Sequence, residues 1–170
     1  RDIERVVSKF VVDSFWRDLV AFTWNIKTVE GHEGIADMLS ARLADTDPSG
    51  FRTAEPPTEE INGDTVITSA FIEFETATGR GKGHLRLRSD DTGDRAWTLL
   101  TTLQELKGHE EPNGPRRPLG AVHGSDPDRR SWAEKRLDEE LSLGYTVQPY
   151  TVVIGGGQGG IALGARLSQL

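Results

Sequence analysis

The sequence predicts an α+β domain, with helices on one face of a curved antiparallel sheet, followed by the beginning of an α/β nucleotide-binding domain. Three observations lead to this fold class. Helical spacing of apolar residues comes early in the chain, and consecutive strand-like segments joined by short turns follow it. A region rich in proline and glycine then separates these segments from a short apolar run and the glycine-rich stretch Gly155–Gly160.

We therefore expect four segments. Residues 1–106 form the α+β domain, and 107–130, with four prolines and four glycines, form a linker across the surface. Residues 131–144 hold a connecting helix, and 149–170 begin the second domain.

The first part of the α+β domain contains two predicted helices and two predicted strands. Apolar residues recur at helical spacing over Ile3–Val11, which predicts a helix. Phe15–Phe22 and Trp24–Val29 mix aromatic and aliphatic residues with charges, as strands do. Helical spacing returns over Ile35–Leu43.

The second part of this domain is predicted to be strands only. Thr65–Thr76 is rich in β-branched and aromatic residues, and Gly79–Gly81 is typical of a turn. Residues 83–88 alternate, with the leucines on one face and the basic residues on the other. A polar hairpin tip over 89–94 leads to a last strand over 96–106.

Composition excludes several classes of function. The chain has 170 residues, 20 Lys+Arg against 27 Asp+Glu, and a formal net charge of −7, which argues against nucleic-acid or anionic-membrane binding. No apolar stretch approaches the roughly 18 residues that span a bilayer. Cys is absent, which removes disulfides and thiolate chemistry, and we expect a cytoplasmic protein. Because Met38 is the only methionine and Leu170 ends inside a helical pattern, we expect a fragment of a longer protein.

The glycine-rich stretch carries the chemistry of the second predicted domain. Helical spacing over Trp132–Leu143 ends at Gly144, and Tyr150–Ile154 is predicted to be a buried strand. Gly155, Gly157 and Gly160 then satisfy G-x-G-x-x-G before a helix of small and apolar residues. The first glycine would allow the turn, the second would let a pyrophosphate approach, and the third would let the helix pack closely. The candidate cofactor-binding residues are Gly155, Gly156, Gly157, Gln158, Gly159 and Gly160.

A second candidate site lies in the α+β domain, where several aromatic and polar residues could line a cavity in the curved sheet. Asp18 or His84 would act there as acid or base, and the alternative is a core of aromatic residues with polar groups at its rim. These candidates are Trp16, Asp18, Trp24, Phe71, His84 and Trp97.

Two further clusters have simpler explanations. His109, Glu110 and Glu111 are consecutive and lack a completing ligand, so we predict a solvated loop and no metal site. The pairs Arg116–Arg117 and Arg129–Arg130 could hold a phosphate, but solvated linker charges are expected in an acidic protein.

These residues also resemble known families. Phe15–Leu19, the segment Gly31–Leu39 and the strands after them are similar to an NTF2-like (SnoaL-like) domain, whose first helix would then lie before Arg1. The whole chain resembles the front of bacterial flavin-containing monooxygenase-like oxidoreductases, through Leu106–Pro118, Trp132–Arg136 and Gly155–Gly164.

This resemblance implies an FAD- and NAD(P)H-dependent monooxygenase acting on a small molecule, with FAD pyrophosphate at Gly155–Gly160 and the NADPH region and catalytic residues outside this chain. Two alternatives stay open. The first is an NTF2-like module that binds a small molecule or forms a homodimer without catalysis of its own. The second is an NAD-dependent dehydrogenase, since the acidic residue that separates FAD, NAD and NADP would lie beyond Leu170.

Overall fold

The computed structural model describes the chain except for residues 1, 64, 91–92, 118–127 and 168–170. The chain divides into two compact units, Arg1–Glu111 and Pro112–Leu170. Parts of the predicted linker and the last residues of the predicted terminal helix lie outside the described residues. Within the described residues, no helix is both long and apolar enough to cross a membrane.

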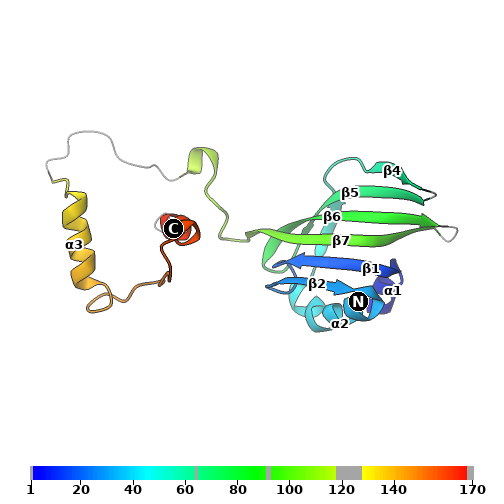
Figure 1. Cartoon of the computed structure of the whole chain (residues 1–170), viewed down its shortest axis with the longest axis horizontal. Coiled ribbons are helices and arrows are strands. Elements are labelled where there is room, and N and C mark those ends of the chain that lie inside the picture. Colours follow the sequence, from blue (N-terminus) through cyan, green and yellow to red (C-terminus); the bar gives the residue numbers. More distant parts are fainter. Residues whose placement is uncertain (1, 64, 91–92, 118–127, 168–170) are drawn as a thin grey trace. The chain divides into compact units, whose positions relative to one another are not determined.

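The first unit is an α+β domain, as predicted. Its elements are α1 (Ile3–Val7), β1 (Phe10–Leu19), β2 (Ile26–Glu30), α2 (Gly31–Thr46), β3 (Ser49–Thr53), β4 (Thr58–Asn62), β5 (Thr65–Glu75), β6 (Gly79–Asp90) and β7 (Gly93–Leu106). The strands form one sheet in the order β2-β1-β7-β6-β5-β3, and β4 pairs with β5 (Figure 1). All pairs are antiparallel except β1 with β7, which are parallel, so the wholly antiparallel sheet that we predicted was wrong at this pair.

The first predicted helix is too long, and β1 begins earlier than predicted. Helix α1 ends at Val7, and the chain enters the sheet at Phe10. Ala96 N donates to Lys9 O at 2.8 Å, and Phe10 pairs with Ala96 in β7. The segment that begins at Phe10 therefore forms a strand paired with β7 and not the end of a helix. Its aromatic and β-branched residues suit a pleated strand at least as well as a helix.

The turn between β1 and β2 also lies elsewhere than predicted, over residues 20–25. Val20 and Trp24 adopt left-handed backbone angles (φ 58° and 53°), which bulky side chains rarely do. The Asp18 carboxylate accepts hydrogen bonds from Phe22 N and Thr23 N at 3.0 and 2.8 Å. A buried side chain holds this turn in place of the glycine or proline that would have marked it in the sequence.

Gly79–Gly81, predicted as a turn, lies inside strand β6. The turn is one step earlier, where Thr76 N donates to Gly79 O at 2.8 Å. A Cβ placed on Gly81 would come 2.3 Å from Phe74 Cζ, because the Phe74 ring lies across the backbone of the neighbouring strand. Glycine at position 81 is thus required because the Phe74 ring packs closely against it, and not because the chain turns there.

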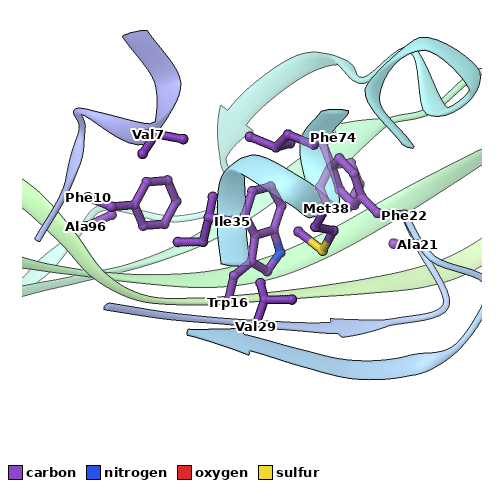
Figure 2. Packing of buried hydrophobic residues seen from close by; sticks show 11 residues of the cluster. Val7, Phe10, Trp16, Ala21, Phe22, Val29, Ile35, Met38, Phe74 and Ala96 are labelled. Atoms are coloured by element: carbon purple, nitrogen blue, oxygen red, sulfur yellow. The ribbon is translucent and has the colours of Figure 1, made fainter. Parts of the chain in front are cut away.

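The hydrophobic core lies between α2 and the inner face of the sheet (Figure 2). Trp16 stacks with Phe10 at 5.9 Å between ring centroids and meets Phe22 edge-on at 5.1 Å. Helix α2 supplies Ile35, Met38 and Leu39 to this core, which confirms the second predicted helix. Helix α2 packs on β1, β2 and α1, so it covers the β1–β2 side of the sheet.

The described residues of the second unit form a short 3₁₀ turn η1 (Gly114–Arg116) and two helices, α3 (Trp132–Ser142) and α4 (Gln158–Leu167). Helix α3 begins with a capping box between Ser131 and Glu134, and Gly144 follows its C-cap with φ 81°. The predicted strand at Tyr150–Ile154 does not form in the structure, which shows no regular element there. A strand needs a neighbour for its backbone groups, and no strand of the described residues pairs with this segment.

Candidate functional site

A cavity of about 620 Å³ lies on the inner face of the sheet, beyond the part that α2 covers. Its wall includes four half-buried side chains from three strands, which are Ile72, Leu85, Leu87 and Leu99. Trp16, Phe10 and Ala96 add buried apolar surface, and Val6 of α1 and Phe51 of β3 stand on the open side. Helix α1 (Ile3–Val7) contributes Arg5 and Val6 to the lining of this cavity.

The cavity wall follows from strand alternation and cross-strand register. Leu85 of β6 pairs with Ala70 of β5 and with Leu99 of β7, so these three side chains share one face. The leucine alternation predicted for 83–88 is confirmed, with Leu85 and Leu87 both on the cavity side. Gly83 precedes Leu85 in β6. A Cβ placed on Gly83 would come 2.5 Å from Leu100 O in β7, so this position requires glycine.

The polar residue at the buried end of the cavity is Thr101, which is 1% exposed. Trp16 Nε1 donates to Thr101 Oγ1 at 2.9 Å, and Thr101 Oγ1 donates to Asp18 Oδ1 at 2.7 Å. Asp18 is 0% exposed, and its other oxygen, Oδ2, accepts from Phe22 N, Thr23 N and Thr23 Oγ1. Donors on several sides hold this carboxylate, which therefore orients Thr101 and fixes the β1–β2 turn.

The rim of the cavity is charged and exposed. Asp2, Arg5, Lys9 and Asp94 line it. Asp2 Oδ1 accepts from Arg5 N at 2.9 Å and so caps α1, while Ser89 Oγ donates to Asp94 Oδ1 at 2.6 Å. With two acidic and two basic residues, the rim favours neither sign of charge on a ligand.

The six residues predicted to line one pocket are placed in three different regions. Trp16 lines the cavity and Asp18 lies behind Thr101. Phe71 and His84 lie on the opposite face of the sheet, because each is next in its strand to a cavity residue, and their rings are 4.7 Å apart. Trp97 carries Arg86 and Arg88 over its ring, at 5.0 and 4.1 Å from the centroid.

Trp24, the sixth of these residues, is 60% exposed beside a separate hollow of about 220 Å³ that Arg42 and Thr78 also line. The residues that form the cavity besides Trp16 were missed as a site. Thr101 and Leu99 lie in an ordinary strand pattern, and nothing in the sequence marks them as facing open space.

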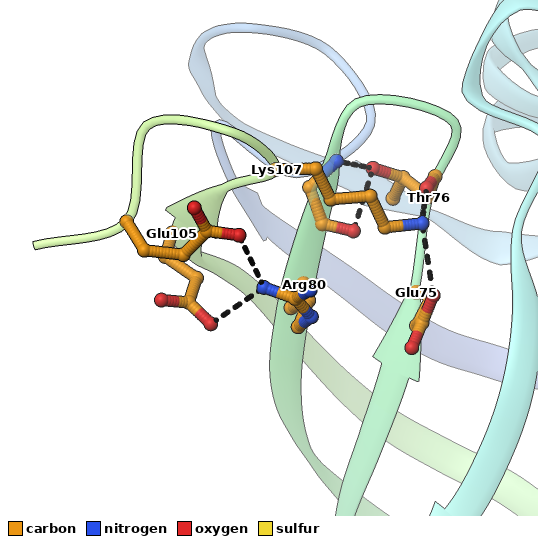
Figure 3. A network of polar contacts seen from close by, with 7 residues as sticks. Glu75, Thr76, Arg80, Glu105 and Lys107 are labelled. Atoms are coloured by element: carbon orange, nitrogen blue, oxygen red, sulfur yellow. Dashed lines mark hydrogen bonds and ion pairs between the residues drawn. The ribbon is translucent and has the colours of Figure 1, made fainter.

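Ion pairs connect the end of β7 and the residues that follow it with β6 and β5 (Figure 3). Arg80 Nη1 lies 3.0 Å from both Glu105 Oε1 and Glu110 Oε1, and Lys107 Nζ lies 2.8 Å from Glu75 Oε2. The hydrogen bond from Arg80 lowers the pKa of Glu110 to about 2, and the one from Lys107 lowers the pKa of Glu75. Glu110 is thus an ion-pair partner, and no group of three His, Asp or Glu residues able to hold a metal ion occurs in the described parts of the chain.

The glycine stretch of the second unit forms a tight turn before α4. Gly155 has φ 115°, and a Cβ on Gly160 would come 1.9 Å from Gly155 O. Both positions therefore require glycine. Nothing lies within 4 Å of a Cβ placed on Gly156, Gly157 or Gly159, and Gln158 begins α4. The helix and the turn agree with the prediction, whereas the strand that would precede them is not present, so a Rossmann-type strand-turn-helix is not shown.

Comparison with known proteins gives a likeness of fold. No family model matches the chain, and no curated protein matches it. Similar solved structures include an NTF2-like protein with a cystatin-like fold from Novosphingobium aromaticivorans, at 20% identity over 60% of this chain and 69% of that one, with a TM-score of 0.40. A protein from the same organism, provisionally named an aromatic ring hydroxylase, shares 19% identity over 62% and 78%, with a TM-score of 0.43.

A third similar structure is a cystatin-like fold protein of unknown function from Nostoc punctiforme, at 14% identity over 61% of this chain and 77% of that one, with a TM-score of 0.44. At these identities and TM-scores, the likeness concerns the outline of the helix-and-sheet unit and carries no information about activity.

Proposed function

We propose that the first unit is a binding module for a small, largely apolar molecule, which occupies the cavity between α1 and the inner face of the sheet. The supporting observation is the group of half-buried leucines and Ile72 that line this cavity. Burial of apolar surface yields about 25 cal/mol per Å² removed from water, so a ligand that covers these side chains gains affinity without rearranging the core. The volume of about 620 Å³ falls in the range of small-molecule sites.

The test fills the cavity by substitution and measures the fluorescence of Nile red, an apolar dye that brightens when it leaves water. Leu99→Trp places an indole in the cavity, and the matched control Leu100→Trp places the same side chain one residue on, on the opposite face. We expect Leu99→Trp to weaken binding by about tenfold or more and Leu100→Trp by less than about twofold. Equal affinity of Leu99→Trp and the wild type, with both folded by circular dichroism, would contradict the proposal.

The control pair also deals with dye that binds elsewhere. Several apolar side chains of the second unit are exposed, including Trp132, Tyr150 and Ile154. Dye bound at those residues would respond to neither substitution, because both lie in β7 of the first unit. Only the difference between the two variants reports on the cavity.

A second candidate function concerns the turn Gly155–Gly160, which we propose holds the pyrophosphate of FAD in an oxidoreductase of which this chain forms part. Its support is the glycine geometry: positive φ at Gly155, contact between Gly160 and Gly155, and open space above Gly156 and Gly157. The free N–H groups at the start of α4 would face the phosphates. FAD, reduced by NADPH, would supply the redox chemistry, and the residues named here would only bind and orient it.

The test adds FAD to the ¹⁵N-labelled chain and follows the backbone amide signals. We expect shifts confined to residues 155–161, lost in Gly160→Ala and kept in Gly164→Ala, whose Cβ would meet nothing within 4 Å. Amide signals that stay unchanged at millimolar FAD would overturn this second proposal and leave the first intact.

A further inference from the structure

Thr101 is the polar residue at the buried end of the cavity, and the hydrogen bonds of its hydroxyl run in one direction. An indole N–H can only donate, so Trp16 Nε1 donates to Thr101 Oγ1 at 2.9 Å. A carboxylate can only accept a hydrogen bond, so the Thr101 hydroxyl donates to Asp18 Oδ1, 2.7 Å away. No rotation of the hydroxyl satisfies both partners in another way.

Asp18 is itself fixed in this arrangement. Its Oδ2 accepts from Phe22 N at 3.0 Å and from Thr23 N at 2.8 Å, and the residue is fully buried. A rotation that turned Oδ1 away from Thr101 would break these bonds to the backbone. The Thr101 hydroxyl therefore continues to donate its hydrogen bond to Asp18 while a ligand is bound.

A hydroxyl oxygen has one proton and two lone pairs. The Thr101 hydroxyl donates its proton in the hydrogen bond to Asp18 and accepts the hydrogen bond from Trp16 with one lone pair. The second lone pair therefore remains without a partner in these two bonds, on an oxygen whose residue lines the cavity. We infer that the cavity selects apolar molecules that present a single hydroxyl or N–H donor, over molecules of the same shape that present only an acceptor oxygen. This inference rests on the proposed binding function of the same cavity.

The other polar groups of the cavity do not compete with this selection. Asp2, Arg5, Lys9 and Asp94 are exposed at the rim, where water satisfies a ligand's polar atoms equally well. The walls are leucine, isoleucine and aromatic side chains without hydrogen-bonding atoms that reach inward, apart from Trp16 Nε1, which is already bonded to Thr101. The discrimination between donor and acceptor therefore falls to Thr101.

The first test compares two probes with the wild-type chain, 2-naphthol and 2-methoxynaphthalene, by titration calorimetry at neutral pH. Both are uncharged and share one ring system, but only 2-naphthol has a donor. One net hydrogen bond corresponds to a preference of about five- to tenfold for 2-naphthol. Equal binding of the two probes, or tighter binding of 2-methoxynaphthalene, would overturn the inference.

The second test reverses the direction of the hydrogen bond. In Asp18→Asn, the amide oxygen can take the place of Oδ2 and accept from Phe22 N and Thr23 N, which turns the amide NH₂ toward Thr101. Thr101 then accepts from both this amide and Trp16, and its proton becomes available to a ligand. We expect the preference for 2-naphthol to fall to about onefold or below, with 2-methoxynaphthalene gaining affinity.

The matched control is Asp13→Asn, which makes the same chemical change on the same strand. Asp13 pairs with Arg88 at 2.8 Å, away from the cavity, and should leave the five- to tenfold preference unchanged. A preference that persists in folded Asp18→Asn would also overturn the inference. If that variant does not fold, the comparison of the two probes on the wild type decides.

The tests separate this inference from the proposed function. If Nile red binds and Leu99→Trp weakens it, but the two naphthalene probes bind equally, the module binds apolar molecules and Thr101 does not select among them. If neither Nile red nor either naphthalene probe binds, the proposed function and the inference fail together.

Discussion

Thr101 Oγ1 lies 2.7 Å from Asp18 Oδ1, and this hydrogen bond joins β7 to β1 across the parallel strand pair of the sheet. The same carboxylate holds Phe22 N and Thr23 N in the turn that leads to β2. The buried side chain of Asp18 thus connects Thr101, at the buried end of the cavity, with the backbone of the β1–β2 turn. The turn has no glycine, so the hydrogen bonds to Asp18 fix a backbone conformation that the residues of the turn do not favour by themselves.

Replacement of Asp18 by alanine should destabilise the first unit strongly. The variant leaves Phe22 N, Thr23 N and the Thr101 hydroxyl without their acceptor in a buried place, which we expect to cost about 3 kcal/mol of unfolding free energy. Urea denaturation measures this change. Asp13→Ala serves as control, because its pair with Arg88 is exposed and should contribute less than about 1 kcal/mol. Similar losses in the two variants would contradict the prediction.

The contact between Gly81 and Phe74 predicts a second change in stability. A Cβ at position 81 would lie 2.3 Å from Phe74 Cζ, so Gly81→Ala must displace the Phe74 ring from the core and should cost about 2 kcal/mol. Phe74→Leu removes the obstructing ring, and the double variant should lose less than the sum of the single variants by about 1 kcal/mol. Urea denaturation of all four proteins checks this coupling, and simple additivity would refute it.

The pair formed by Arg80 and Glu110 predicts a dependence on pH. Its hydrogen bond lowers the pKa of Glu110 from 4.5 to about 2 in the folded chain. Because the folded-state pKa lies below the unfolded one, the stabilising effect is complete above pH of about 4.5 and disappears as the pH falls toward 2. A carboxyl-carbon NMR titration measures the pKa of Glu110 directly.

Two variants distinguish the origin of this shift. Arg80→Ala should return the pKa of Glu110 toward its ordinary value, whereas Lys107→Ala should instead raise the lowered pKa of Glu75, whose main partner is Lys107. A high concentration of salt should reduce both shifts, since both pairs are exposed. If Arg80→Ala leaves the pKa of Glu110 low, the ion pair is not its cause.

Much of the first unit could be predicted because its pattern and its packing agree. The apolar spacing of Ile35, Met38 and Leu39 predicts helix α2, and these residues do form its buried face. The β-branched run from Thr65 predicts β5, and the alternation in β6 predicts that Leu85 and Leu87 share one face, as they do in the cavity wall. In each case the local preference and the tertiary contact favour the same conformation.

The remaining features depend on contacts between distant residues, which a local pattern does not contain. Phe10 suits a helix by spacing but pairs with Ala96, far along the chain, and Gly81 is a glycine because Phe74 covers it. Tyr150–Ile154 has a strand composition, but no neighbouring strand pairs with it among the described residues. Thr101 gains its place in the candidate site only through Asp18 and Trp16, so its sequence neighbours give no signal.

Two glycines of the second unit should respond oppositely to alanine even without a ligand. Gly164 lies inside α4 with nothing within 4 Å of an added Cβ, so Gly164→Ala should stabilise the helix by about 1 kcal/mol. Gly160→Ala offers the same gain in helix propensity, but its Cβ would come 1.9 Å from Gly155 O and must open the turn. Amide hydrogen exchange over α4 should therefore slow in Gly164→Ala and quicken at residues 158–161 in Gly160→Ala. Slower exchange in both variants would show that Gly160 is tolerant of a side chain and that the close approach to Gly155 does not hold the turn.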